Sequence, residues 1–85
     1  VNSHSIALTA ELRDAGITFH LMLNAYWEPL EFELPDVSDA HPGGWRRWID
    51  TSLESPDDIV QWESAPQVAG RVYGTAASSV ALLIR

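Results

Sequence analysis

The sequence predicts an all-β fold, an antiparallel β-sandwich of about six to seven short strands that forms a single domain over residues 1–85. Several short segments alternate apolar and polar residues with a period of two, and residues that favour turns separate them. A chain of 85 residues suits one domain with a modest core. Its apolar fraction of 46% is too high for a disordered segment, and its apolar runs are too short to span a membrane. The chain is therefore expected to fold in water.

The first two strands are expected at residues 6–12 and 17–24, joined as a β-hairpin. Arg13–Gly16 supplies the turn, because glycine adopts positive φ at little cost. The first strand is predicted to be half-buried, with one apolar face made by Ile6, Leu8, Ala10 and Leu12. The second strand is predicted to point Ile17, Phe19, Leu21 and Leu23 into the core and Thr18, His20, Met22 and Asn24 to the other side. Met22 indicates that this other side is partly covered.

A corner at Ala25–Glu28 is expected to end the hairpin, because Pro29 cannot donate to a strand ladder and disfavours helix in the residue before it. The next strand, residues 30–34, has the clearest alternation of the sequence. Its apolar residues Leu30, Phe32 and Leu34 are expected inside, and Glu31 and Glu33 in water. Residues 36–44 are rich in turn formers and are expected to be a surface loop.

The second half of the chain is predicted to add three strands. Residues 45–51 have strand composition but imperfect alternation, which a β-bulge would explain. Residues 52–70 show no sustained period, and Ser55 followed by Pro56 is compatible with the start of a short helical turn. Residues 71–75 and 78–84 are expected to be the last strands, the final one with Val80, Leu82 and Ile84 toward the core.

Charge and cysteine content narrow the classes of partner and compartment. Five Arg residues stand against twelve acidic residues, and the net charge of −7 disfavours nucleic acid and anionic membranes as partners. The chain has no Cys and no signal-peptide pattern at its start, so a cytoplasmic protein is the expectation. It begins with Val1 instead of Met, which is compatible with processing or with a fragment of a longer chain.

No catalytic residue, metal ligand or cofactor site is predicted. Glu28, Glu31 and Glu33 have a spacing that glycosidases could use, but alternation places Glu31 and Glu33 on a solvated face with nothing to raise a carboxyl pKa. The three histidines, His4, His20 and His41, lie in different segments without metal-ligand spacing. Paired carboxylates on a wet surface are not an active site.

The aromatic residues are the stronger candidates for function. Flat rings with a polar edge suit sugar rings, and they are also frequent in cores and domain interfaces. The candidate residues for carbohydrate binding or for a domain interface are Tyr26, Trp27, Trp45, Trp48 and Trp62. The sequence does not decide between a sugar-binding role, a place in an interface and a place in the core.

Four segments also resemble a known family. Ser3–Thr9, Phe19–Pro35, Trp45–Thr51 and Ser78–Leu83 are similar, in order, to the C-terminal β-domain of isoamylase-type glycogen-debranching enzymes. The most specific part is the corner Asn24–Pro29 that leads into an alternating strand. The resemblance implies an antiparallel sandwich that follows a catalytic (β/α)₈ barrel of the α-amylase superfamily, the domain that hydrolyses α-1,6 branch linkages in glycogen. Nothing in this chain resembles the catalytic motifs of that barrel.

The resemblance implies a non-catalytic accessory domain that packs against and stabilises the barrel, its expected partner. Tyr26 and Trp27, at the corner, would then help to seat the domain. The alternative is a stand-alone module that binds α-glucan. Rings aligned in an exposed groove favour sugar, and a broad apolar patch favours a protein partner.

Overall fold

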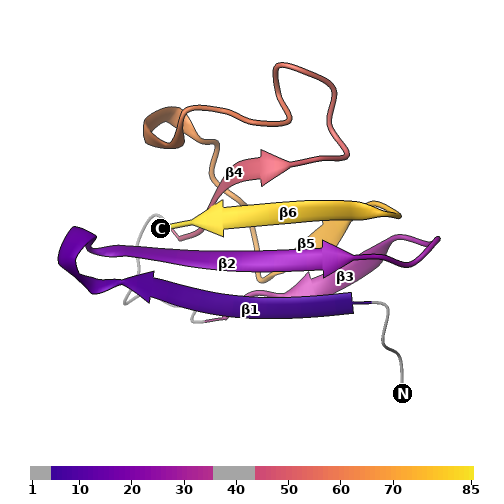
Figure 1. The fold of residues 1–85 in the computed structure, drawn as a ribbon, viewed down its shortest axis with the longest axis horizontal. Helices are drawn as coiled ribbons and strands as arrows, with labels where there is room; N and C mark the ends of the chain where they lie inside the picture. The colour runs from indigo at the N-terminus through magenta and orange to yellow at the C-terminus, as the bar shows by residue number, and fades with distance from the viewer. Residues whose placement is uncertain (1–4, 36–43) are drawn as a thin grey trace.

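The fold consists of two antiparallel sheets. The structure is a computed structural model, and it describes residues 5–35 and 44–85. One sheet has four strands in the order β1-β2-β6-β4, and the other pairs β3 with β5 (Figure 1). The strands span β1 Ser5–Leu12, β2 Ile17–Asn24, β3 Leu30–Glu33, β4 Arg46–Asp50, β5 Val72–Thr75 and β6 Ser79–Ile84. The all-β class and the six short strands are as the sequence predicts. The expected loop at residues 36–44 lies almost wholly outside the described residues.

The predicted hairpin is confirmed. β1 and β2 pair in an uninterrupted register from Ser5↔Asn24 to Leu12↔Ile17. A short 3-10 helix, η1 (Arg13–Ala15), makes the turn, and Gly16 follows it with φ of +66°. The positive φ explains why glycine suits this position.

The predicted bulge is also confirmed. The register of β4 against β6 shifts between Arg47 and Ile49. The segment at Ser55 forms a hydrogen-bonded turn instead of a helix, with the Asp57 N–H donating to the Glu54 carbonyl at 2.8 Å. The segment after β4 folds back along that strand, where Ile59 forms a bridge with Ile49. Asp50 N–H donates to the Asp58 carbonyl, at 2.9 Å, so backbone groups that a helix would pair internally are used by the strand. The only described helical turn in this part is η2, at Trp62–Ser64.

The small core lies between the two sheets. Met22, Leu34, Trp45, Ala81 and Leu83 form it, and Phe32, Val68 and Tyr73 pack against it. Glu31 and Glu33 are exposed on β3, as alternation predicts.

The predicted orientation of the four-stranded sheet is wrong. On β2 the buried residues are His20, Met22 and Asn24, whereas the apolar residues that were expected in the core, Ile17, Phe19, Leu21 and Leu23, are only partly buried. On β6 the same side buries Ser79, Ala81 and Leu83, although Ile84 is also buried. The prediction assigned the more apolar side to the core, but β3 and β5 cover the other side. The expected half-buried state of β1 is also wrong, because β1 is the edge strand of its sheet and almost all of it is exposed on both sides.

Candidate functional site

The structure places the predicted aromatic residues in several separate places. Trp45 is 1% exposed in the core, where its indole N–H donates to the Pro35 carbonyl at 2.9 Å. Trp48 stacks on Phe19 with ring centroids 5.8 Å apart, and Trp62 lies in η2 with 39% of its surface exposed. Tyr26 and Trp27 are neighbours at the corner, with ring centroids 5.4 Å apart and planes tilted by 44°. The set therefore does not form one flat row of rings.

Asn24 fixes the corner that carries Tyr26 and Trp27. Its side chain is completely buried, and its amide nitrogen donates to the carbonyls of Glu28, at 2.9 Å, and Ala76, at 3.1 Å. Its amide oxygen accepts from the Tyr26 N–H at 2.9 Å. One side chain thereby ties the end of β2 to the start of β3 and to the β5–β6 connection. Trp27, at 72% exposed, is held out into water on this fixed support.

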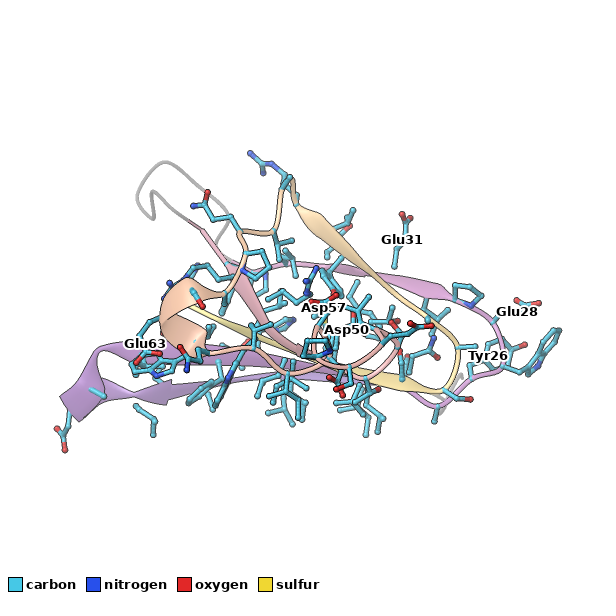
Figure 2. The ribbon with its side chains drawn as sticks, turned by 90° about the horizontal axis from the view of Figure 1, so that it is seen from above. Tyr26, Glu28, Glu31, Asp50, Asp57 and Glu63 are labelled. Carbon is cyan, nitrogen blue, oxygen red and sulfur yellow. The ribbon has the colours of Figure 1, made fainter. Side chains whose placement is uncertain are left out.

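A broad apolar surface lies on the side of the four-stranded sheet that faces away from β3 and β5. We call it the outer face. Register pairing places on it Ile6, Leu8, Ala10, Leu12, Ile17, Phe19, Leu21, Leu23, Val80 and Leu82. Ile6, Leu8 and Leu12 each expose about half of their surface (53%, 50% and 51%). Figure 2, which views the sheets edge-on, shows side chains projecting from this side with no described segment beyond them. These side chains are apolar and form a patch that is partly exposed to solvent, and at its β4 end the same side also carries the buried Ile84 and the charged Arg46.

The opposite side of the same sheet buries polar groups. Asp50 is 4% exposed, and its carboxylate accepts hydrogen bonds from the Ser52 N–H at 3.0 Å and the Ser52 hydroxyl at 2.6 Å. The Tyr73 hydroxyl donates to the other oxygen of the same carboxylate. Burial, together with this hydrogen bond and the Asp50 charge, raises the pKa of Tyr73 well above its ordinary value. Tyr73 therefore stays neutral and links β5 to β4, which is a structural role.

His20 is a second buried polar group in this layer. It is 5% exposed, its Nδ1 lies 2.9 Å from the Thr9 hydroxyl, and its ring lies 5.6 Å from that of Trp45. Its Nε2 is buried without a hydrogen-bond partner. Burial, and next the positive charge of Arg85, lower the pKa of His20 below its ordinary value. The neutral imidazole is the form that this site accommodates.

We expect stability to fall as the pH drops below about 6.5, the ordinary pKa that His20 has in the unfolded chain. The unfolded state then binds a proton that the folded state refuses, and the loss continues until the pH passes the lowered folded pKa. Urea unfolding at about pH 7.5, 6.5 and 5.5 measures it. In His20→Phe the fall over this range should be smaller. An equal fall in both proteins would contradict the prediction.

The described residues hold no arrangement typical of an active site. Glu28, Glu31 and Glu33 are all exposed, and Figure 2 shows Glu28 at the corner and Glu63 at the opposite end of the molecule. Within segments 5–35 and 44–85, no group of three or more His, Asp or Glu side chains could hold a metal ion. His4 and His41 lie outside these segments. The same segments contain no helix long and apolar enough to cross a membrane.

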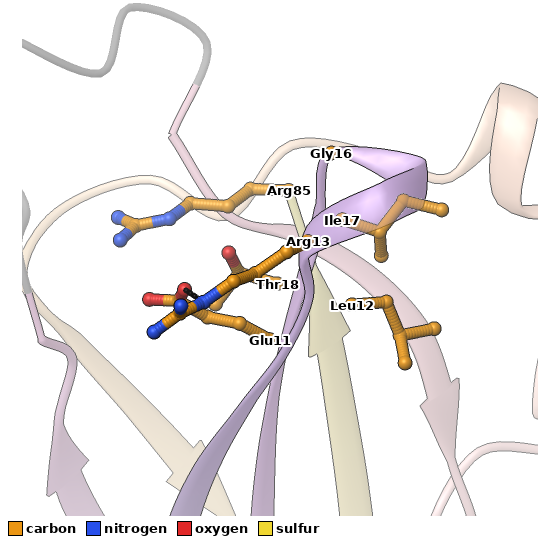
Figure 3. Close-up of a pocket in the computed structure, with 7 residues that line it drawn as sticks. All are labelled: Glu11, Leu12, Arg13, Gly16, Ile17, Thr18 and Arg85. Atoms are coloured by element: carbon orange, nitrogen blue, oxygen red, sulfur yellow. Dashed lines mark ion pairs between the residues drawn. The ribbon is translucent and has the colours of Figure 1, made fainter.

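An open depression at the turn end of the β1–β2 hairpin is lined in part by charged side chains. It has a volume of about 410 Å³ and is lined by Glu11, Leu12, Arg13, Gly16, Ile17, Thr18 and Arg85 (Figure 3). The Arg13 side chain is 90% exposed and lies 3.8 Å from the Glu11 carboxylate. The Arg85 guanidinium lies over the Trp45 ring, 4.3 Å from its centroid. The Arg13–Glu11 pair is solvated and offers a ligand little net attraction, and the Arg85 guanidinium is already engaged by the Trp45 ring.

Sequence reasoning did not identify the two features that stand out in the structure, the outer face and the Asn24 hydrogen bonds. For the outer face, the alternation of β2 separates a wholly apolar side from the side of Thr18, His20 and Asn24, but it does not say which side the rest of the chain covers. For Asn24, its position directly before the corner is the sequence feature that could have indicated side-chain hydrogen bonds to the corner backbone. No protein-family model matches the chain, and no curated protein is significantly similar to it.

Proposed function

We propose that this chain is a non-catalytic accessory domain of a glycogen-debranching glycoside hydrolase. In this proposal it packs against the catalytic barrel that hydrolyses α-1,6 branch linkages and stabilises it, in the cytoplasm. The resemblance of four segments to the C-terminal domain of isoamylase-type enzymes names the family. The observation that carries the proposal is the outer face, over which no described segment packs (Figure 2).

The outer face supports a protein partner for an energetic reason. Burial of apolar surface contributes roughly 25 cal/mol per Å². A chain that leaves its most apolar sheet face in water forgoes that stabilisation unless another surface covers it. The face is broad and mostly apolar, with Arg46 only at its β4 end, so it suits a broad apolar surface better than a sugar ring. Parts of larger proteins have such faces where their neighbouring domain sits.

An α-glucan-binding module is the second candidate, and the corner favours it. Trp27 is the most exposed of the large apolar residues in the described segments, and Asn24 holds its backbone in place. A fixed, exposed indole is a suitable surface for stacking a sugar ring. The 44° tilt between Tyr26 and Trp27 leaves a single ring, not a platform, for such a contact.

A fluorescence titration separates the two candidates. All four Trp residues act as reporters while linear and branched malto-oligosaccharides are added to the chain. The accessory domain should give a flat response up to millimolar sugar and should release no reducing ends from glycogen. A saturable response that Trp27→Ala abolishes would favour the glucan-binding module instead.

A binding experiment tests the accessory role directly. The chain is mixed with the catalytic barrel of an isoamylase-type enzyme that lacks its own C-terminal domain, and co-elution and the melting temperature of the barrel are measured. We expect a complex and a higher melting temperature. The double variant Ile6→Thr/Leu8→Thr, which makes the outer face polar and keeps strand-favouring residues, should weaken the complex at least tenfold. Ala7→Thr, on the other side of the same strand, is the matched control. Absence of any complex with the wild-type chain would overturn the proposal.

A further inference from the structure

The free edge of β1 is a second surface, distinct from the outer face. β1 is the outermost strand of the four-stranded sheet, and all of its residues after Ser5 are exposed (Figure 1). Within the described parts of the chain, no residue pairs with β1 on the side away from β2. The strand is eight residues long and runs without a bulge, so it presents an uninterrupted edge. Edges of this kind pair readily with another strand.

The hydrogen bonds of β2 identify the backbone groups on this edge. Thr18 N–H donates to the Arg85 carbonyl at 2.9 Å, and the Thr18 carbonyl accepts from Arg85 N–H at 3.0 Å. Both backbone groups of Thr18 therefore point toward the β6 side, and its partner on β1, Glu11, forms a non-hydrogen-bonded pair with it. The N–H and carbonyl of Glu11 must then point away from β2. Because the pattern repeats every second residue, those of Ala7 and Thr9 do the same.

The edge also lacks the features that usually block strand addition. Natural edge strands are protected by Pro, Lys, a bulge or an inward-pointing charge. Between Ile6 and Leu12 there is no Pro, no Lys and no bulge, and the only charged residue is Glu11. A second strand can therefore approach along the whole length of β1.

We infer that β1 pairs with β1 of a second copy of this chain. The two strands run antiparallel about a two-fold axis that is perpendicular to the sheet and passes midway between the two Thr9 residues. Ala7, Thr9 and Glu11 of each copy supply the hydrogen bonds, and the two four-stranded sheets join into one. The axis keeps the outer faces of both copies on the same side.

The residue pattern of β1 suits this self-pairing. In the register centred on Thr9, Ile6 lies opposite Leu12 of the other copy and Leu8 opposite Ala10, so apolar residues meet on the outer face. On the other side Thr9 meets Thr9, and Glu11 meets Ala7. No like charges are opposed within the strand, although each copy carries a net charge of −7. Pairing should therefore strengthen as added salt screens the repulsion between the copies.

The small size of the β1–β1 interface limits the affinity of the dimer. About seven residues from each copy take part, compared with roughly 20–30 a side in a standard stable interface. The dimer should therefore be weak, with its fraction rising over a range of about 10 to 500 µM chain. Sedimentation velocity over this range, at low and high salt, measures that rise.

Ala7→Pro tests the edge without changing any side chain of the outer face. Proline lacks the N–H that the proposal needs at position 7, and it is tolerated where that N–H faces away from the neighbouring strand. We expect Ala7→Pro to remain folded by circular dichroism and to lose at least nine tenths of the dimer. A folded Ala7→Pro protein that dimerises like the wild type would overturn the proposal and would assign dimerisation to the outer face.

Single cysteines test the register, since the chain has no Cys of its own. Residues directly opposite in a hydrogen-bonded antiparallel pair have Cα atoms about 5.5 Å apart, within the range of a disulfide. Thr9→Cys should form a covalent dimer under mild oxidation, and Glu54→Cys, at an exposed turn position away from β1, should not. This test stays informative if Ala7→Pro fails to fold. Equal cross-linking of the two variants, or a wild-type chain that remains monomeric over the whole range, would overturn the proposal.

Discussion

Replacing Trp45 by alanine is expected to lower the free energy of unfolding by about 3–5 kcal/mol. Trp45 is the largest of the fully buried side chains and contacts the core from the start of β4. Alanine would remove that packing, the hydrogen bond to the Pro35 carbonyl, and the ring beneath the Arg85 guanidinium. A domain of 85 residues typically has a total stability of only about 4–13 kcal/mol. The loss is therefore a large fraction of the total stability, and the urea midpoint of Trp45→Ala should fall accordingly.

Urea unfolding followed by far-ultraviolet circular dichroism measures this loss, because the remaining tryptophans make fluorescence harder to compare. Trp27→Ala is the matched control, since Trp27 is 72% exposed and its removal should change stability by about 0.5 kcal/mol or less. If the two variants have the same midpoint, the sheets are not held together by the core described above.

The strands could be predicted because their signals are local. Alternation of period two marks β1, β2 and β3, and Gly16 and Pro29 mark where the chain must turn or stop pairing. The bulge in β4 was predictable because one residue too many interrupts the alternation. Each of these features depends on residues that are neighbours in the sequence.

The side of the sheet that forms the core could not be predicted in the same way. Alternation separates two faces but does not say which face the rest of the chain covers. The usual assumption gives the more apolar face to the core, which placed Leu21 and Leu23 inside. In the structure the Asn24 corner directs β3 to the side of Met22, and the apolar face is left outside. The error therefore points to the same surface that supports the proposed function.

The aromatic candidates show the same limit. Composition identified them, but their use depends on contacts distant in sequence, such as Trp45 with Pro35 and Trp48 with Phe19. Trp27 is the one whose exposure its local setting favours, because it lies in the corner between the end of β2 and Pro29. Composition can therefore identify aromatic residues as candidates, but it cannot say whether each ring lies in the core or on the surface.

Replacing Asn24 by alanine is expected to lower the free energy of unfolding by about 2–4 kcal/mol, the second-largest effect. The change leaves the Tyr26 N–H and the carbonyls of Glu28 and Ala76 without their partner in a completely buried position. The corner should loosen before the sheets separate. Amide hydrogen exchange measures this order, because the Tyr26 N–H, bonded to Asn24, and the Ser78 N–H, bonded to the Tyr26 carbonyl, should lose protection first.

The control for Asn24→Ala is Gln61→Ala, which removes an exposed amide side chain and should change stability by about 0.5 kcal/mol or less. Asn24→Asp separates hydrogen bonding from shape, because it keeps an acceptor for the Tyr26 N–H but places a carboxylate against two carbonyl oxygens. At neutral pH it should destabilise the chain at least as much as alanine does. If Asn24→Ala instead keeps the wild-type stability and the wild-type protection of Tyr26, the corner is fixed by its packing alone, and Trp27 is not held in place by Asn24.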